Sequence, residues 1–417
     1  MTKGETMNLR AMMPSALLLL SLMALPGTAT GADAPPAVTK AEAPSAVKIG
    51  ILTDESGIYA EAGGPGNVAA ARLAIADAGG TVLSRPIELL DADHKNDPAV
   101  GTQILTGWLD DGVDAVAGLS TSSVALAAQN IARARDKTLL IAGAPDSDLT
   151  GRACAATSTH WAEDTYALAR STAEAVVPSG GDSWFFVTVD HAFGLAMERD
   201  ANEAARALGA LVLGRVRHPL GTADFSAVIN AAKASHAKIV ALADAGADLE
   251  HMIQQAGAAH LDAGGQTLAG LLVYLTDIHA VGLAAAQRLY VTEGFYWDQN
   301  DAARAFAKRF ETEMHRMPTK QQAATYASVR HYLAAVAAAG TTEARAVNAE
   351  MRTLPIDFFG RPATIRPDGQ VAYDLTLYQV KSPAESQYPW DYLKKVRDIP
   401  AARAFRPVAE GGCPLVK

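Results

Sequence analysis

The chain has 417 residues, a formal net charge of −9 and two cysteines. This length suits two domains. The acidic balance excludes function classes that need a broad basic face, nucleic-acid binding above all.

The N-terminus has the pattern of a secretory signal peptide. Lys3 and Arg10 precede the apolar run 11–25, and small residues follow it. A positive flank, a short apolar core and a small-residue end are typical of such signals, and the run is short for a membrane span. We expect cleavage after Ala32, with Ala29 as second choice, an uncleaved anchor as the alternative, and a periplasmic mature chain.

Beyond an Ala- and Pro-rich stretch at 33–46, read as a flexible linker, short apolar runs alternate with stretches of helical period. The predicted strands are 47–52, 87–90, 113–117, 138–141, 184–189, 211–216, 239–243, 271–275 and 289–292. The predicted helices include 67–78, 124–135, 195–208, 302–315 and 323–338. Short, often β-branched runs predict buried parallel strands. The alternation predicts an α/β fold of doubly wound sheets with right-handed crossovers.

In such sheets a ligand lies beyond the carboxyl ends of the strands. The turns after two predicted strands, 118–123 and 143–151, carry hydroxyl and small residues but no His, Lys or Glu that could activate a hydroxyl. This pattern indicates a polar ligand site rather than an enzyme. The candidate ligand-binding residues are Tyr59, Thr121, Ser122, Ser123, Gly143, Ala144, Trp161, Phe193, Asp244, Thr276 and Trp297.

Some of these candidates have two interpretations. Ser122 and Ser123 either cap the next helix or, with the free N–H groups of its first turn, bind an anion, and the two roles are compatible. Trp161, Phe193 and Trp297 are either core residues or flat walls of a binding site. We favour the second role for the aromatics, and Tyr59 is similar.

Other chemistries fit less well. The Gly63–Gly66 turn lacks the Lys and Ser/Thr of a phosphate loop and the spacing of a dinucleotide site. Asp91, Asp93, His94 and Asp97 are possible metal ligands, but we favour a solvated loop. The sequence has no GxSxG nucleophile turn. We therefore expect no cofactor and no metal.

Cys154 and Cys413 remain after cleavage of the signal. In an oxidising compartment a disulfide between them is the economical interpretation, and two free buried thiols are the alternative. A disulfide would tie the C-terminal tail to the lobe that carries the ligand site.

Four segments are distinctive in sequence and order: VKIGILTDESGIYAEAGGPG from Val47, GLSTSSVALAAQ from Gly118, WFFVTVDHAFG from Trp184 and DFSAVINAAK from Asp224. They resemble the type I periplasmic binding proteins, and more narrowly the branched-chain amino acid class of ABC-transporter substrate-binding proteins. The resemblance runs from about residue 47 to 380. It implies two lobes joined by three crossovers and closing on a ligand by a hinge motion.

The resemblance also implies boundaries. They are 1–32 signal peptide, 33–46 linker, 47–160 with 293–340 for lobe 1, 161–292 with 341–380 for lobe 2, and 381–417 for a tail packed on the lobes.

Site residues carried over from the family begin with the Ser122 hydroxyl, which matches the group that holds the ligand carboxylate. Gly143 and Ala144 match the next turn, but Pro145 stands where amino acid binders offer a hydroxyl and an N–H. This departure disfavours an α-amino acid ligand.

On the other lobe, Phe193 matches an aromatic position where the family often has Tyr. The acid that pairs with a ligand ammonium falls near Thr276, and Asp244 is a second candidate. Together with the tryptophans, these changes slightly favour an aromatic or other organic acid over an amino acid.

The function implied is that of a periplasmic receptor, expected to be monomeric, which binds a small organic acid or amino acid and delivers it to the permease subunits of an ABC importer. Closure needs only a higher ligand affinity in the closed state. A periplasmic sensor that presents the same ligand to a membrane-bound regulator is the alternative.

Overall fold

The computed structural model describes residues 45–416, which lie in one compact unit. The signal-peptide prediction for 1–32, and all of the 33–46 linker but its last two residues, fall outside the described residues. Within the described range, no helix is long and apolar enough to cross a membrane.

The first sheet has the strand order β2-β3-β1-β4-β5-β6. Its strands are β1 (Val47–Thr53), β2 (Thr81–Val82), β3 (Arg85–Asp93), β4 (Ala115–Gly118), β5 (Thr138–Ile141) and β6 (Ser158–His160). Neighbouring strands are parallel except β2 and β3. Strands β1, β4 and β5 are mostly Val, Ile, Leu and Ala and are almost wholly buried, as strands covered on both faces are.

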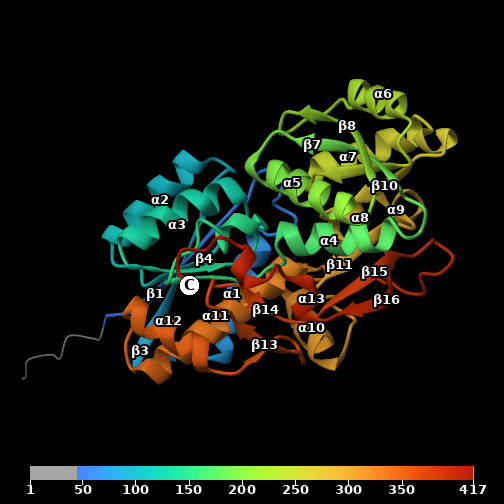
Figure 1. The fold of residues 1–417 in the computed structure, drawn as a ribbon. Coiled ribbons are helices and arrows are strands. Elements are labelled where there is room, and N and C mark those ends of the chain that lie inside the picture. The colour runs from blue at the N-terminus through green and yellow to red at the C-terminus, as the bar shows by residue number, and fades with distance from the viewer. Residues whose placement is uncertain (1–44, 417) are drawn as a thin grey trace, which may run out of the picture. The chain divides into compact units, whose positions relative to one another are not determined.

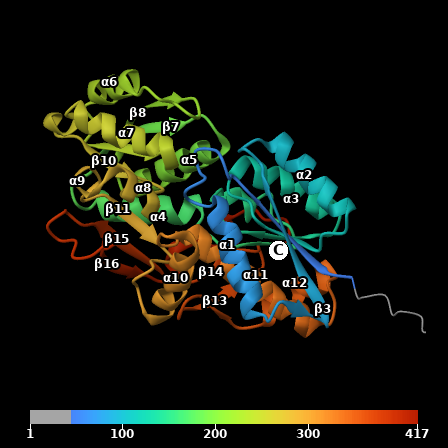
Figure 2. The ribbon, with the colours of Figure 1, turned by 180° about the vertical axis from the view of Figure 1, so that it is seen from behind.

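Helices cover both faces of this sheet (Figures 1 and 2). They are α1 (Gly64–Asp77) and α11 (Lys320–Ala339) on one face, and α2 (Pro98–Asp110) and α3 (Ser122–Ala134) on the other. Because side chains alternate along a strand, Ile49 and Ile51 pack toward α1 and α11, whereas Leu52 packs toward α2 and α3. We call this sheet and its helices the first lobe.

The second sheet is parallel throughout, in the order β10-β9-β7-β8. Its strands are β7 (Ser183–Val189), β8 (Leu211–His218), β9 (Ile239–Ala243) and β10 (Thr267–Gly270). Trp184 and Phe186 pack toward α4 (Thr165–Val176) and α5 (Ala192–Ala207). Phe185 and Val187 pack toward α6 (Ser226–Ser235) and α7 (Gly246–Ala258). We call this sheet and its helices the second lobe.

The other strands form small antiparallel sheets in the orders β11-β15-β16 and β12-β13-β14. They are β11 (Tyr290–Glu293), β12 (Ile356–Asp357), β13 (Pro362–Ile365), β14 (Val371–Ala372), β15 (Leu375–Val380) and β16 (Leu393–Ile399). The remaining helices and turns are α8 (Leu275–Val281), α9 (Leu283–Ala286), α10 (Asp301–Met314), α12 (Ala344–Thr353), α13 (Ala401–Ala404), η1 (Ser147–Leu149), η2 (Leu261–Gly264) and η3 (Val408–Glu410).

Two sequence expectations differ from the structure. The strand predicted at 271–275 is wrong, because β10 ends at Gly270 and α8 begins at Leu275. The sequence also assigned 341–380 to the second lobe. In the structure, Val347 and Met351 of α12 lie in the apolar cluster of β1, α1 and α11, whereas Tyr378 and Val380 of β15 lie in the cluster of α6 and α7.

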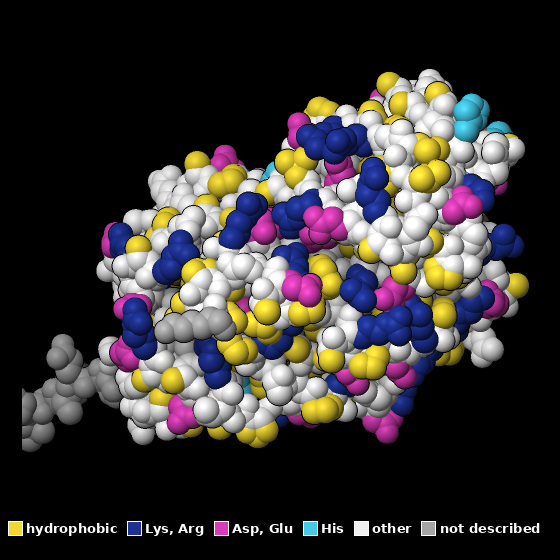
Figure 3. All heavy atoms as spheres, viewed as in Figure 1, with side chains coloured by type: hydrophobic (Ala, Val, Ile, Leu, Met, Phe, Trp, Pro, Cys, Tyr) yellow, Lys and Arg dark blue, Asp and Glu magenta, His cyan; other side chains and the backbone are white. Residues whose placement is uncertain are grey.

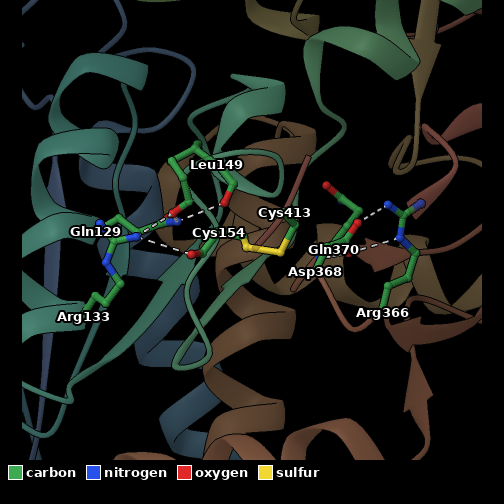
Figure 4. Close-up of a disulfide and its surroundings, with 9 residues drawn as sticks. Gln129, Arg133, Leu149, Cys154, Arg366, Asp368, Gln370 and Cys413 are labelled. Carbon is green, nitrogen blue, oxygen red and sulfur yellow. Dashed lines mark hydrogen bonds and ion pairs between the residues drawn. A yellow bond between two sulfur atoms is a disulfide. The ribbon is translucent and has the colours of Figure 1, made fainter. Parts of the chain in front are cut away.

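The C-terminal tail is bound covalently to the first lobe. Cys154 and Cys413 form a disulfide, the pairing that the sequence favoured, with Cα atoms 5.7 Å apart (Figure 4). The Gln129 side chain of α3 donates to the Leu149 carbonyl beside it at 2.9 Å. The tail therefore ends against the turn that follows β5.

Acidic and basic side chains are interspersed over the face shown in Figure 3. The Lys and Arg side chains on that face do not gather into one broad basic surface.

Candidate functional site

A small cavity lies where strand ends of the two lobes meet. Its volume is about 10 Å³, which is room for about one water molecule. The lining residues are Tyr59, Ser120, Thr121, Ser122, Gly143, Pro145, His191, Phe193, Ala245, Leu272 and Tyr274. Anything larger than water must therefore enter by separation of the lobes or displacement of side chains.

The lining residues meet because each follows the carboxyl end of a parallel strand, the edge at which α/β folds bind ligands. Two glycines permit the close approach. A side chain at Gly143 would collide with the Gln321 amide, and Gly246 has φ +62° and lies against the Ile58 carbonyl oxygen of the first lobe. Backbone groups therefore form part of the cavity wall.

Hydroxyl groups of the lining lack partners. Within residues 45–416, the buried Tyr59 Oη, Thr121 Oγ1 and Ser122 Oγ atoms have no hydrogen-bond partner. The nearby Ser120 hydroxyl differs, because it lies 2.6 Å from Thr53 Oγ1 and accepts from Gln321 Nε2 at 2.8 Å. An unpaired buried polar group is costly and rare in proteins, so these hydroxyls are suited to bind a group that is not part of the chain.

Three helices begin at the cavity. Thr121, His191 and Ala245 are the N-cap residues of α3, α5 and α7, and in this described part of the chain none of them makes a side-chain cap hydrogen bond. The first N–H groups of a helix carry partial positive charge and attract anions. The cavity therefore has an environment that favours a negatively charged group.

Charged side chains are missing from the lining. Among the described residues that line the cavity, none is Asp, Glu, Lys or Arg. Asp244 precedes the lining residue Ala245, but its Oδ2 atom lies 3.1 Å from His218 Nε2 and its Oδ1 atom accepts from the Ala245 N–H at 2.9 Å. A ligand ammonium would therefore find no carboxylate in this lining.

His191 connects the lobes beside the cavity. Its Nε2 atom lies 3.0 Å from Ser123 Oγ of α3, and Nδ1 has no partner among the described residues. Burial lowers the pKa of His191, so the ring is neutral at pH 7. In a neutral imidazole one nitrogen donates and the other accepts, which leaves Nδ1 available to the cavity.

Comparison with known proteins identifies the family and the fold. A sequence profile described as periplasmic binding protein matches residues 46–386. The chain belongs to this family. Periplasmic binding proteins bind solutes without transforming them, so membership confirms the prediction that the chain is not an enzyme.

Solved structures confirm the predicted α/β binding-protein fold. A periplasmic binding protein from Burkholderia mallei is 41% identical, and the match covers 89% of this chain and 100% of that one, with a TM-score of 0.87. A branched chain amino acid ABC transporter periplasmic ligand-binding protein from Burkholderia xenovorans LB400 is 34% identical, with the same coverage and a TM-score of 0.79. A solute binding protein of an ABC transporter from R. palustris, in complex with benzoate, shares the fold at 20% identity, the same coverage and a TM-score of 0.79. No curated protein sequence matches the chain.

Five of the predicted site residues line the cavity of this binding protein: Tyr59, Thr121, Ser122, Gly143 and Phe193. Ser123 does not, because its hydroxyl pairs with His191. Ala144 is buried behind the lining, and its carbonyl accepts from His160 Nε2 at 2.7 Å.

The predicted tryptophans lie elsewhere in the binding protein. Trp161 is fully buried in the core of the first lobe, with its Nε1 donating to Thr159 Oγ1 at 2.8 Å. Trp297 donates to the Trp390 carbonyl at 3.0 Å. Thr276 lies in α8 outside the lining. Thr276 and Trp297 come soon after predicted strands and Trp161 directly follows β6, but position along the chain does not fix the direction of a side chain.

The sequence missed several lining residues. Leu272 and Tyr274 were placed inside a strand, whereas they follow β10 and so reach the carboxyl edge of the sheet. His191 and Ala245 stand directly after predicted strands and could have been chosen by the strand-end rule. Ala245 has no polar side chain to mark it as a site residue. It contributes to the cavity through the backbone at the start of α7.

Proposed function

We propose that this periplasmic binding protein is the solute receptor of an ABC importer and that its ligand is a small carboxylic acid without an ammonium group. It delivers this acid to the permease subunits. The name of the 34% identical B. xenovorans protein, an ABC transporter ligand-binding protein, supports the transport role.

One observation carries the ligand class. Three uncapped helix N-termini and three unpartnered hydroxyls surround a cavity whose lining, within the described residues, has no charged side chain. Helix N-termini and hydroxyls stabilise a carboxylate without a basic side chain. An ammonium group would lose its hydration there without gaining a carboxylate partner.

The apolar part of the lining favours a compact hydrocarbon group beside the carboxylate. Phe193, Leu272 and Tyr274 supply flat or branched apolar surface. Pro145 occupies the lining where an N–H donor would serve an amino acid. Small aromatic and branched aliphatic acids therefore fit this surface.

The test uses matched ligands in thermal unfolding and calorimetry. 4-Methylpentanoate and L-leucine differ by the ammonium group, and benzoate and benzamide differ by the negative charge. We expect at least one of the two acids to stabilise the protein, by about 2.7 kcal/mol at 100 times its dissociation constant, whereas leucine and benzamide have no effect. Stabilisation by leucine alone would overturn the assignment.

A further inference from the structure

A second polar group lies in the second lobe, behind the cavity wall. His218 ends β8, Asp244 directly follows β9, and Asp248 lies in the first turn of α7. Their exposed fractions are 3%, 0% and 1%. One ligand atom from each residue lies within 4.8 Å of the others. His218 lies far from Asp244 and Asp248 in the sequence, and the three residues match no metal motif, so the sequence analysis expected no metal here.

Hydrogen bonds fix the orientation of the histidine. His218 Nδ1 lies 3.1 Å from the Pro219 carbonyl oxygen, which can only accept, so Nδ1 carries a proton. In the neutral ring, Nε2 then has a free lone pair, and it lies 3.1 Å from Asp244 Oδ2. Two lone pairs at this distance repel unless a proton or a metal ion lies between them. A backbone carbonyl that binds the second nitrogen is typical of metal-ligating histidines.

The hydrogen bonds of the chain leave the ligand atoms available. Asp244 Oδ1 accepts from the Ala245 N–H, and Asp248 Oδ2 accepts from the Gly221 N–H at 2.8 Å. In residues 45–416, His218 Nε2 and Asp244 Oδ2 have no hydrogen bond of good geometry despite their complete burial.

The two carboxylates have no full cation beside them other than the protonated form of His218 within the described residues. Among the described residues, no Lys or Arg forms an ion pair with Asp244 or Asp248. A divalent cation would offset both carboxylates.

We propose that His218 Nε2, Asp244 Oδ2 and the Asp248 carboxylate bind one divalent transition-metal ion of the Zn²⁺ type. Imidazole and carboxylate are proper ligands for Zn²⁺, which accepts three protein ligands with water in the fourth position. Ca²⁺ requires six to eight oxygen ligands, and this group offers too few. Because Asp244 and Asp248 flank Ala245, the ion fixes the start of α7 at the cavity wall. The proposal does not depend on the identity of the cavity ligand.

The test is calorimetric titration of tag-free, chelator-treated protein with ZnCl₂ and, separately, with CaCl₂. We expect one Zn²⁺ per chain and no comparable binding of Ca²⁺. Cysteine thiols cannot account for the Zn²⁺ binding, since Cys154 and Cys413 form a disulfide. Asp248→Asn keeps the size of the side chain and an acceptor for the Gly221 N–H. It should weaken Zn²⁺ binding by more than about 100-fold, since loss of even an outer-shell partner costs 10- to 100-fold.

The matched control is His251→Gln, which removes an exposed histidine one turn along the same helix. This variant should bind Zn²⁺ as the unmodified protein does. Equal losses in both variants, or a stoichiometry far from one, would mean surface binding and would overturn the proposal. Co²⁺ provides a measurement that needs no variant. The intense visible bands of four-coordinate Co²⁺ are expected, and the pale spectrum of six-coordinate Co²⁺ would also overturn it.

Discussion

Two polar regions join the lobes, and they differ in whether their side chains have partners. In the cavity, Tyr59, Thr121 and Ser122 present hydroxyls without partners in the described part of the chain. The second region, which we call the Asp200 network, is fully paired at its centre. It consists of Ser147, Thr165, Arg199, Asp200 and Arg406.

The pairing in the Asp200 network is dense. Ser147 Oγ and Thr165 Oγ1 donate to Asp200 Oδ2 at 2.7 and 2.5 Å. Arg199 Nε donates to Asp200 Oδ1 at 2.9 Å, and Arg406 of the tail donates to Ser147 Oγ at 2.7 Å. Similar side chains at one interlobe surface therefore have two different roles. Paired groups stabilise the fold, and unpaired groups are reserved for a ligand.

The largest expected effect comes from removing the disulfide that anchors the tail carrying Arg406. The double variant Cys154→Ser and Cys413→Ser frees a loop with a sequence separation of 259 residues. The free energy of unfolding should fall by up to about 5 kcal/mol, because the unfolded chain gains conformational entropy. Urea unfolding measures this change. An unchanged free energy would show that the tail contributes no stability to the paired region.

Asp200→Ala should have the next largest effect. It leaves the two buried hydroxyls of Ser147 and Thr165 without their acceptor, whereas Arg199 keeps its ion pair with Asp148. Each buried group that loses its partner costs about 1–3 kcal/mol. Urea unfolding is again the measurement. Asp190→Ala, at an exposed carboxylate, is the control and should change stability by less than about 0.5 kcal/mol. Similar losses in both variants would contradict the assignment of Asp200 to the fold.

Ser122→Ala should act on binding and not on stability. An acid identified in the ligand panel should bind this variant more weakly. The loss should be about 1.5–3 kcal/mol of binding free energy, the range for a hydrogen bond to a charged group. Ser158→Ala is the matched control, because Ser158 Oγ is also buried and unpartnered in the described residues but lies in β6, outside the lining. It should leave binding unchanged. If calorimetry showed equal losses of affinity in the two variants, the cavity hydroxyl would have no special role in binding.

A smaller effect concerns pH. Burial lowers the pKa of His191, and a bound carboxylate would raise it again, so affinity should increase as pH falls toward the pKa of His191 in the complex. The gain is at most about tenfold per unit of restored pKa. Without ligand the sign is opposite, because the unfolded chain binds this proton more readily and acid favours unfolding. Calorimetry at pH 7.5 and 6 should show the increase, and His191→Asn should abolish it.

Much of the fold follows from local pattern. Val47–Thr53, Thr138–Ile141 and Ile239–Ala243 are short β-branched or apolar runs bounded by turns, and the structure has strands there. The run at 271–275 has the same composition but lines the cavity and opens α8. Periodicity alone does not separate a buried strand from a buried turn of this length.

The site was predictable where its groups are hydroxyls at strand ends, as with Thr121 and Ser122. The site was not predictable where the direction of a side chain decides whether the residue lines the cavity. Trp161 and Phe193 both follow strands, yet only Phe193 lines the cavity, because it lies in the first turn of α5. The proposed metal group depends on two segments, the end of β8 and the β9–α7 junction, that only the folded second lobe brings together.

The uncapped helix ends have a consequence for how the receptor recognises that it is filled. Helix α3 belongs to one lobe, and α5 and α7 belong to the other. Closure therefore brings partial positive charges of both lobes toward one point, each worth about 0.3–1 kcal/mol to an anion. Under the proposed function, a neutral solute of the right shape leaves this repulsion in place, whereas an acid converts it into attraction. The charge of the cargo would then act as the signal for closure, and shape alone would not suffice.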